Sequence, residues 1–137
     1  MTIDRDDAPR PARRHRGRLL LLALLSAATW FGWFGWDTTY QVDASGNTSG
    51  PYETWQGLGA VLTIVSLVVV GTALRLGTAL VALATAAGLT AGFVITSAPQ
   101  DSSGLWGAGA LFLAVGVFLG AAVVSYVTAW WLRHRTP

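Results

Sequence analysis

Three acidic residues are the first candidates for chemistry in this chain. Asp37, Asp43 and Glu53 fall in the hydrophilic stretch 37–56, which contains no basic residue. Carboxylate oxygens are the ligands that divalent cations prefer, but the spacing of these three matches no known cation-binding loop. We interpret them as solvated surface acids. Because the stretch is longer than a connection between two helices needs, we expect it to be a recognition surface.

Nothing in the sequence assembles a catalytic centre. The chain has no cysteine, and its two histidines, His15 and His134, lie in charged terminal segments far apart along the chain. A nucleophile needs a neighbouring base, and no such pair can be recognised here. We therefore predict that the protein is not an enzyme and that it holds neither a metal ion nor another cofactor.

The long apolar stretches contain no ionisable side chain in their interiors, and this narrows the possible transport functions. Proton relays and coupling sites depend on ionisable groups inside the membrane, so the sequence argues against a proton-coupled exporter. Thr78 and Thr85 are seven positions apart, share a helix face and could line a channel. Such hydroxyls more often bond to a carbonyl of their own helix, and we favour that interpretation.

The composition is that of an integral membrane protein. The 137 residues are 53% hydrophobic and 12% charged, against about 25% charged residues in ordinary soluble domains, and the mean hydropathy is +0.49. Every basic residue apart from the histidines is an arginine. We read this arginine usage as the codon bias of a bacterium with a GC-rich genome.

The apolar run 57–98 constrains the fold most tightly, because its only charged residue is Arg75. One continuous helix of this length would extend about 60 Å, twice the thickness of the hydrocarbon core. The run must therefore form two helices, about 57–74 and 76–97, that turn at Arg75. A helix needs about 20 apolar residues to span a bilayer, which each half supplies.

Two further apolar segments complete the predicted fold. The segment 19–36 resembles a signal peptide cleaved after Ala28, but its apolar run continues through Trp36, so we favour an uncleaved helix. The segment 104–132 carries no charge. We thus predict an all-α integral membrane protein, a four-transmembrane-helix bundle. Its parts are a disordered basic cytoplasmic tail 1–18, a transmembrane domain 19–132 with helices at about 19–36, 57–74, 76–97 and 104–132, and a cytoplasmic C-terminus 133–137.

The loop 37–56 joins the first two helices and has β-type residues on both sides of a turn signal at 44–47. This pattern favours a short β-hairpin on the outer membrane surface.

Small residues recur at four-residue spacing in two of the helices, and such faces allow helix backbones to approach closely in lipid. They are Ala84, Gly88 and Gly92 in the third helix and Gly116 and Gly120 in the fourth. The spacing leaves open whether these faces meet within one chain or meet a second copy.

Tryptophans and arginines indicate how the chain is oriented. Tryptophan favours the membrane interface, and we predict interface anchors at Trp36, Trp55, Trp106, Trp130 and Trp131. Trp30 and Trp33 lie deeper in the first helix, where we expect helix packing rather than a ligand cage. Arginine accumulates on the cytoplasmic side, and the predicted topology signals are Arg13, Arg14, Arg16, Arg18, Arg75, Arg133 and Arg135. Both termini are then cytoplasmic, in a multi-pass protein of the cell membrane.

Two functions agree with these patterns. The first is a multi-pass bacterial membrane protein that acts as an accessory or interaction subunit and contacts a partner through its outer loop. The alternative is a small channel or transporter subunit that assembles as an oligomer through the third and fourth helices. In both cases the expected surroundings are a lipid bilayer and a protein partner or a second copy, not nucleic acid.

Overall fold

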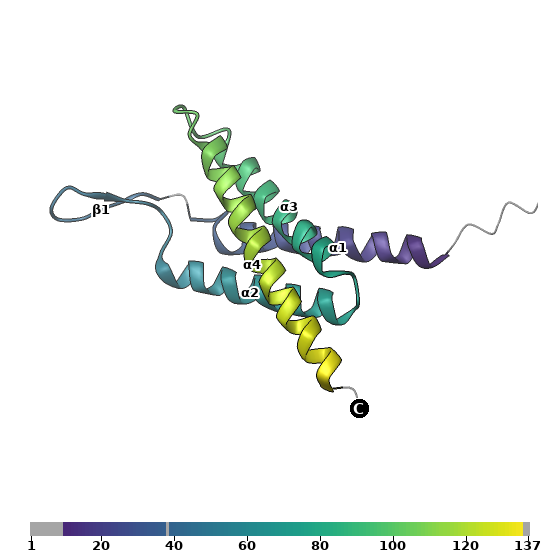
Figure 1. The fold of residues 1–137 in the computed structure, drawn as a ribbon. Coiled ribbons are helices and arrows are strands. Elements are labelled where there is room, and N and C mark those ends of the chain that lie inside the picture. Colours follow the sequence, from purple (N-terminus) through teal and green to yellow (C-terminus); the bar gives the residue numbers. More distant parts are fainter. Residues whose placement is uncertain (1–9, 38, 136–137) are drawn as a thin grey trace, which may run out of the picture.

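The computed structural model of this chain describes residues 10–37 and 39–135. Within them the architecture is all-helical, as predicted, with four long helices (Figure 1): α1 (Arg10–Trp33), α2 (Thr54–Ala73), α3 (Thr78–Ser97) and α4 (Trp106–Arg135). By length and composition, α2, α3 and α4 are apolar enough to cross a membrane. α1 falls outside this group because it begins in the arginine-rich segment and carries five arginines.

The helices alternate in direction, as their contacts show. Ala23 of α1 faces Gly88 of α3, and the Trp30 indole about two turns later bonds to Thr96, so α1 and α3 run parallel. The other two helices run the opposite way. α3 packs extensively on both α1 and α4, and α2 packs on the same two helices. The bundle therefore has two distinct ends.

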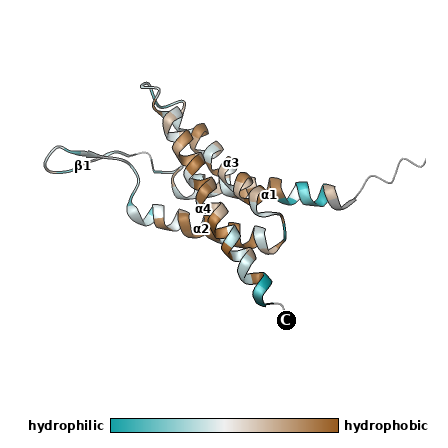
Figure 2. Cartoon of the chain, viewed as in Figure 1, coloured by the Kyte–Doolittle hydropathy of each residue, from teal (hydrophilic) through white to brown (hydrophobic). Residues whose placement is uncertain are grey.

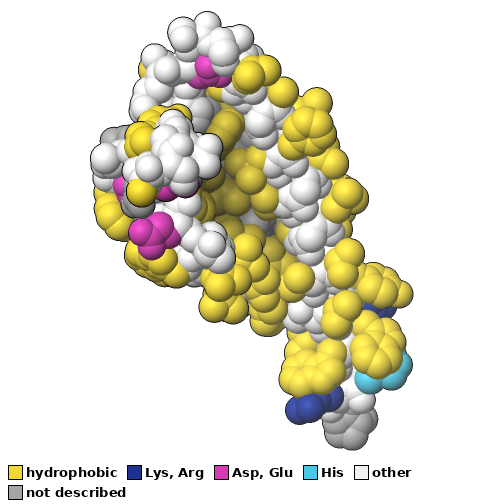
Figure 3. Space-filling model, turned by 90° about the vertical axis from the view of Figure 1, so that its left-hand side faces the viewer, with side chains coloured by type: hydrophobic (Ala, Val, Ile, Leu, Met, Phe, Trp, Pro, Cys, Tyr) yellow, Lys and Arg dark blue, Asp and Glu magenta, His cyan; other side chains and the backbone are white. Residues whose placement is uncertain are grey.

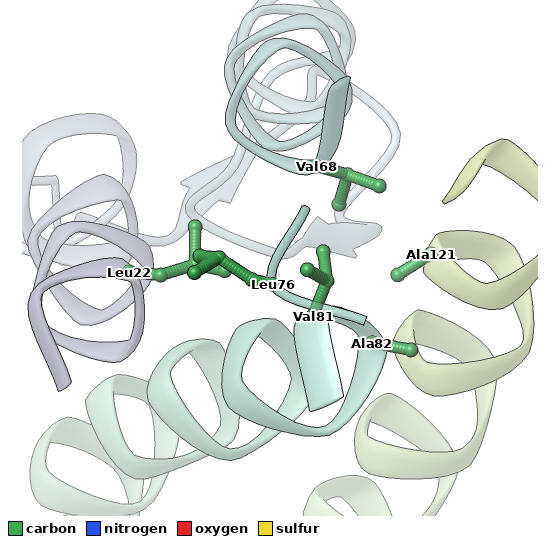
Figure 4. Close-up of a cluster of buried hydrophobic side chains, with 6 residues drawn as sticks. All are labelled: Leu22, Val68, Leu76, Val81, Ala82 and Ala121. Carbon is green, nitrogen blue, oxygen red and sulfur yellow. The ribbon is translucent and has the colours of Figure 1, made fainter. Parts of the chain in front are cut away.

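All four helices contribute to one buried apolar cluster (Figure 4). It combines Leu22 of α1, Val68 of α2, Val81 and Ala82 of α3, Ala121 of α4, and Leu76 from the turn between α2 and α3. Burying a Leu or Val side chain contributes roughly 1.5–3 kcal/mol in water; in lipid the gain comes from close packing instead. The cluster ties the four helices together.

The turn between α2 and α3 is a Schellman motif. The amide of Leu76 donates to the carbonyl of Gly71 and that of Arg75 to the carbonyl of Thr72. Arg75 has φ 57°, the left-handed conformation in which glycine is usual, and Gly77 follows with φ 89°. Leu76 is buried in the apolar cluster, which supplies the hydrophobic contact typical of this motif. The turn predicted at Arg75 is therefore confirmed in position.

The start of α1 departs from the prediction. Residues 10–18 are helical, so the expected disorder up to residue 18 is wrong for this part, and residues 1–9 lie outside the described residues. Arginine is a good helix former, and extending an existing helix avoids the cost of nucleation. The ring Nε2 of His15 also lies 3.2 Å from the carbonyl oxygen of Leu76, which holds this segment against the turn.

The connection between α1 and α2 projects beyond the helices (Figure 1). Within it β1 (Gln41–Val42) and β2 (Thr48–Ser49) pair antiparallel, two residues on each side. An isolated pair of strands is at best marginally stable, and the rest of the connection is irregular. The predicted β-hairpin is therefore not supported as an element of the fold.

The outward faces of the helices are apolar (Figure 2). The large apolar side chains exposed on them include Leu24, Leu62, Leu83, Leu111 and Phe112. Soluble monomers rarely expose contiguous apolar surface of this extent. The faces that point away from the bundle therefore suit an apolar environment.

Candidate functional site at the loop end

Charges separate between the two ends of the bundle. One end, which we call the loop end, carries residues 34–53 and 98–105, and the acids Asp37, Asp43, Glu53 and Asp101 belong to it. The face drawn in Figure 3 shows acidic side chains in its upper part and arginine and histidine at its lower tip. No basic residue occurs between residues 19 and 74 or between 76 and 132. The loop end is thus uniformly acidic.

The opposite end, which we call the basic end, carries the seven arginines proposed as topology signals. The first turns of α1 lie against the turn at Leu76, and one cavity is lined by both Arg75 and Arg133. The turn of α2–α3, the start of α1 and the end of α4 are therefore neighbours. These arginines are Arg13, Arg14, Arg16, Arg18, Arg75, Arg133 and Arg135.

The five proposed anchor tryptophans divide between the same two ends. Trp36, Trp55 and Trp106 lie at the loop end, and Trp130 and Trp131 lie in the last turns of α4. All five are exposed, as an interfacial side chain would be. At the basic end the guanidinium of Arg135 stacks over the Trp131 ring at 3.9 Å from its centroid.

Trp30 and Trp33 lie inside the bundle and join helices there. The indole of Trp30 donates to the Thr96 hydroxyl at 2.9 Å, which links α1 to α3. The indole of Trp33 donates to the Thr63 hydroxyl at 3.1 Å, which links α1 to α2. Because an unpaired donor in an apolar interior is costly, these hydroxyls explain how two indoles are accommodated at depth.

An aromatic cluster attaches the 37–56 loop to the bundle. Tyr52 lies edge-to-face against Phe34, with ring centroids 4.9 Å apart, and also meets Trp30. Trp30 in turn packs edge-to-face on Phe93 of α3 at 5.2 Å. Pairs of this geometry contribute about 0.5–1.5 kcal/mol beyond the area that they bury. The base of the loop is thereby fixed to α1 and α3.

A buried glutamine holds the loop on its other side. Gln56 is fully buried, and its side-chain oxygen accepts a bond from the amide of Glu53 at 2.7 Å. Its side-chain nitrogen donates to the carbonyl of Trp33 at 3.2 Å and to the Asp37 carboxylate at 3.4 Å. One amide therefore connects the end of α1 to the start of α2.

Asp101 organises the second connection at the loop end. Its carboxylate accepts bonds from the hydroxyl and amide of Ser103 and from the amide of Trp106, the first residue of α4. These hydrogen bonds hold the pKa of Asp101 below its ordinary value. The carboxylate therefore stays ionised at neutral pH and caps the N-terminus of α4.

The small-residue faces behave differently in α3 and α4. Gly88 and Gly92 are buried and face α1, where a Cβ on Gly88 would lie 2.0 Å from the carbonyl oxygen of Ala23. Ala84 is half-buried and packs against the apolar cluster. Gly116 and Gly120 are exposed, and a Cβ on either would meet nothing within 4 Å. The α3 face is thus used within the chain, and the α4 face is open.

Two of the hollows in the described part of the chain differ in character. An apolar groove of about 520 Å³ lies between residues 57–68 of α2 and residues 113–124 of α4. A second cavity, of about 310 Å³, lies at the loop end between the 37–56 loop, the ends of α1 and α3, and the start of α4. Only the second mixes aromatic walls with a charged side chain, Asp101. It is the candidate functional site.

Comparisons of the chain with protein-family models, with curated proteins and with solved structures found no match. In the described part of the chain, no three histidine, cysteine, aspartate or glutamate side chains come together as a metal site would require.

Sequence reasoning identified the loop but missed the cavity beneath it. Phe93 and Tyr52 are distant in sequence, and neither stands out in its own segment. Asp101, shortly before the start of a helix, was the one available signal, because a carboxylate near a helix N-terminus is favourable.

Proposed function

We propose that this chain is a four-span membrane protein that acts as a non-enzymatic interaction subunit and binds a partner through its 37–56 loop. The apolar outward faces of the helices support the membrane location. Although α1 starts with arginines, its apolar part from residue 19 runs beside α3 as far as Trp30 and Thr96. A helix packed in parallel along a spanning helix crosses the same layer, which supports α1 as the fourth span.

The charge separation supports a cytoplasmic basic end. All arginines among the described residues lie there, and the charged side chains of the loop end are all acidic. A cytoplasmic basic end would agree with the positive-inside rule. Both termini then face the cytoplasm. Reporter fusions at Ser45, Arg75, Ser102 and Pro137 should give outside, inside, outside and inside signals. An outside signal at Pro137 would contradict four spans.

The observation that carries the proposed interaction role is the construction of the 37–56 loop. Its base is fixed by the aromatic cluster and by Gln56, while Tyr40 and Val42 nearer its tip are both 67% exposed. A simple connector would need neither the length nor the anchoring. A fixed, acidic projection with exposed apolar side chains offers the mixture of contacts that protein interfaces use.

Photocrosslinking in the membrane tests this role. A photoreactive residue at Val42 should form a discrete protein adduct, and the same residue at Phe112, which is exposed on α4, should crosslink to lipid. The adduct at Val42 should disappear when Tyr40 is replaced by Ser. If Val42 and Phe112 give the same products, the loop is not a recognition surface.

The open face of α4 favours a second candidate, a small channel or transporter subunit that functions as an oligomer. A Cβ placed on Gly116 or Gly120 would have no partner atom within 4 Å, so a second copy could approach this face closely. Self-association would then use α4 rather than α3. Gly116→Leu should abolish both the oligomer in mild detergent and solute flux in liposomes. A monomeric wild-type protein without flux would exclude this candidate.

A further inference from the structure

The cavity at the loop end is lined by aromatic side chains together with the polar side chains of Thr96, Ser97, Gln100 and Asp101. Its lining includes Phe34, Tyr40, Tyr52, Phe93 and Trp106, which come from α1, the 37–56 loop, α3 and α4. Its volume of about 310 Å³ equals that of about ten water molecules and lies at the lower end of the range for small-molecule sites. The cavity therefore suits a small compound rather than a macromolecule.

Part of the cavity wall is held in place before any ligand binds. Phe34 and Tyr52 pack edge-to-face, and Phe93 is braced in the same way by Trp30. Trp30 is itself fixed through its bond to Thr96, which also lines the cavity. A preformed site saves the ordering cost that a flexible loop would impose on binding.

The charge around the cavity is negative. Asp101 lines it and remains ionised because its carboxylate receives several hydrogen bonds. Burial raises the pKa of Tyr52, and the nearby Tyr40 and Asp37 add to this effect, which places a second carboxylate near the same wall. Arg75, the one basic residue between residues 19 and 132, belongs to the basic end. An anionic ligand would be repelled, whereas a cation would be attracted.

The type of cation follows from the wall chemistry. A bare divalent ion requires six or more oxygen ligands, usually with several carboxylates, whereas the one carboxylate in the cavity lining, Asp101, already accepts bonds from Ser103 and Trp106. An organic ammonium ion would bind through both the carboxylate and the aromatic rings, because its charge is attracted to the carboxylate and to the ring faces while its alkyl groups leave water. We infer that the loop-end cavity binds an organic ammonium ion, as a free compound or as the headgroup of a lipid such as phosphatidylethanolamine. The cavity shares Tyr40 with the proposed protein-binding part of the loop, whereas Asp101 belongs to the cavity alone.

Calorimetric titration of the full chain in a nonionic detergent tests the inference. The probe is benzyltrimethylammonium, and neopentylbenzene is its uncharged isostere. The charged probe should bind saturably and the isostere at least about ten-fold more weakly, because one Coulombic interaction at short range is lost. Equal binding of the two compounds would overturn the inference.

Four variants locate the site. Asp101→Asn should weaken binding of the probe about ten-fold, whereas Asp43→Asn makes the same change of net charge at the loop tip and should have no effect. Tyr40→Leu should weaken binding about two- to five-fold through loss of a ring. Tyr126→Leu is its matched control, because Tyr40 is 67% and Tyr126 63% exposed and Tyr126 lies outside the cavity. Unchanged affinity in both cavity variants would overturn the inference. If one of them misfolds, unchanged affinity in the other would do so.

Native mass spectrometry distinguishes the two sources of the cation. If phosphatidylethanolamine stays bound from mixed nanodiscs and Asp101→Asn abolishes its retention, the ligand is a lipid headgroup. If no lipid is retained but the free probe binds, the ligand is a soluble ammonium compound. If neither the lipid nor the probe binds, the inference is wrong.

Discussion

The contact between α1 and α3 leads to the sharpest prediction. A Cβ on Gly88 would lie 2.0 Å from the carbonyl oxygen of Ala23 and 2.8 Å from its carbon, and these are backbone atoms. Ordinary contacts begin near 3.4 Å, so Gly88→Ala must push the helices apart by about 1.4 Å. A gap of even about 0.5–1 Å forfeits a quarter to a half of the dispersion energy of the affected atom pairs. We expect a loss of about 2–3 kcal/mol in the free energy of unfolding.

Two further glycines provide graded controls. A Cβ on Gly92 would lie 2.7 Å from the Cβ of Trp30, so Gly92→Ala should destabilise less than Gly88→Ala. A Cβ on Gly116 would meet nothing within 4 Å, so Gly116→Ala should leave stability unchanged or raise it by up to about 1 kcal/mol through helix propensity. Unfolding with sodium dodecyl sulfate in mixed micelles, followed by far-UV circular dichroism, measures all three. If Gly116→Ala destabilises more than Gly88→Ala, the reasoning is refuted.

Three other predictions use the same unfolding assay. Ser125→Ala removes the 2.6 Å hydrogen bond to Thr72 between α2 and α4 and should cost about 0.6–1.7 kcal/mol; Thr128→Val, which removes a bond within α4 alone, should cost less. Arg75→Gly should raise the free energy of unfolding by about 1 kcal/mol, because glycine adopts the left-handed conformation without strain. A lower free energy of unfolding would contradict the strain at Arg75. The pKa of Asp101 is lowered in the folded protein, so its ionised carboxylate stabilises the fold. This contribution is complete above the unfolded-state pKa of about 3.9 and is lost as the pH falls through the lower folded-state pKa. The stabilities of wild type and Asp101→Asn should therefore differ at pH 6 and converge once the pH falls below the folded-state pKa of Asp101; a constant difference would disprove the role of the charge.

The four helices and most of their bounds could be predicted from the sequence, because long apolar runs end at glycine, proline or charged residues. The turn at Arg75 followed from length alone. The prediction failed where a helix boundary depends on contact with another segment of the chain. Residues 10–18 look like a charged tail in isolation, yet they continue α1 and lie against the turn at Leu76.

The candidate site depends on tertiary structure. The spacing showed that Gly88 and Gly116 belong to helix faces made of small residues. It could not show that Gly88 packs on α1 while Gly116 stays open, because the rotation of each helix about its axis depends on all its neighbours together. The loop-end cavity likewise joins Tyr52, Phe93 and Asp101, which no local pattern connects. By itself the sequence determined the helices and, from residue 10 onward, the separation of acids from arginines, because hydrophobic length and charge are properties of each segment. Only the folded bundle decided which side chains meet, because a contact is a property of a pair.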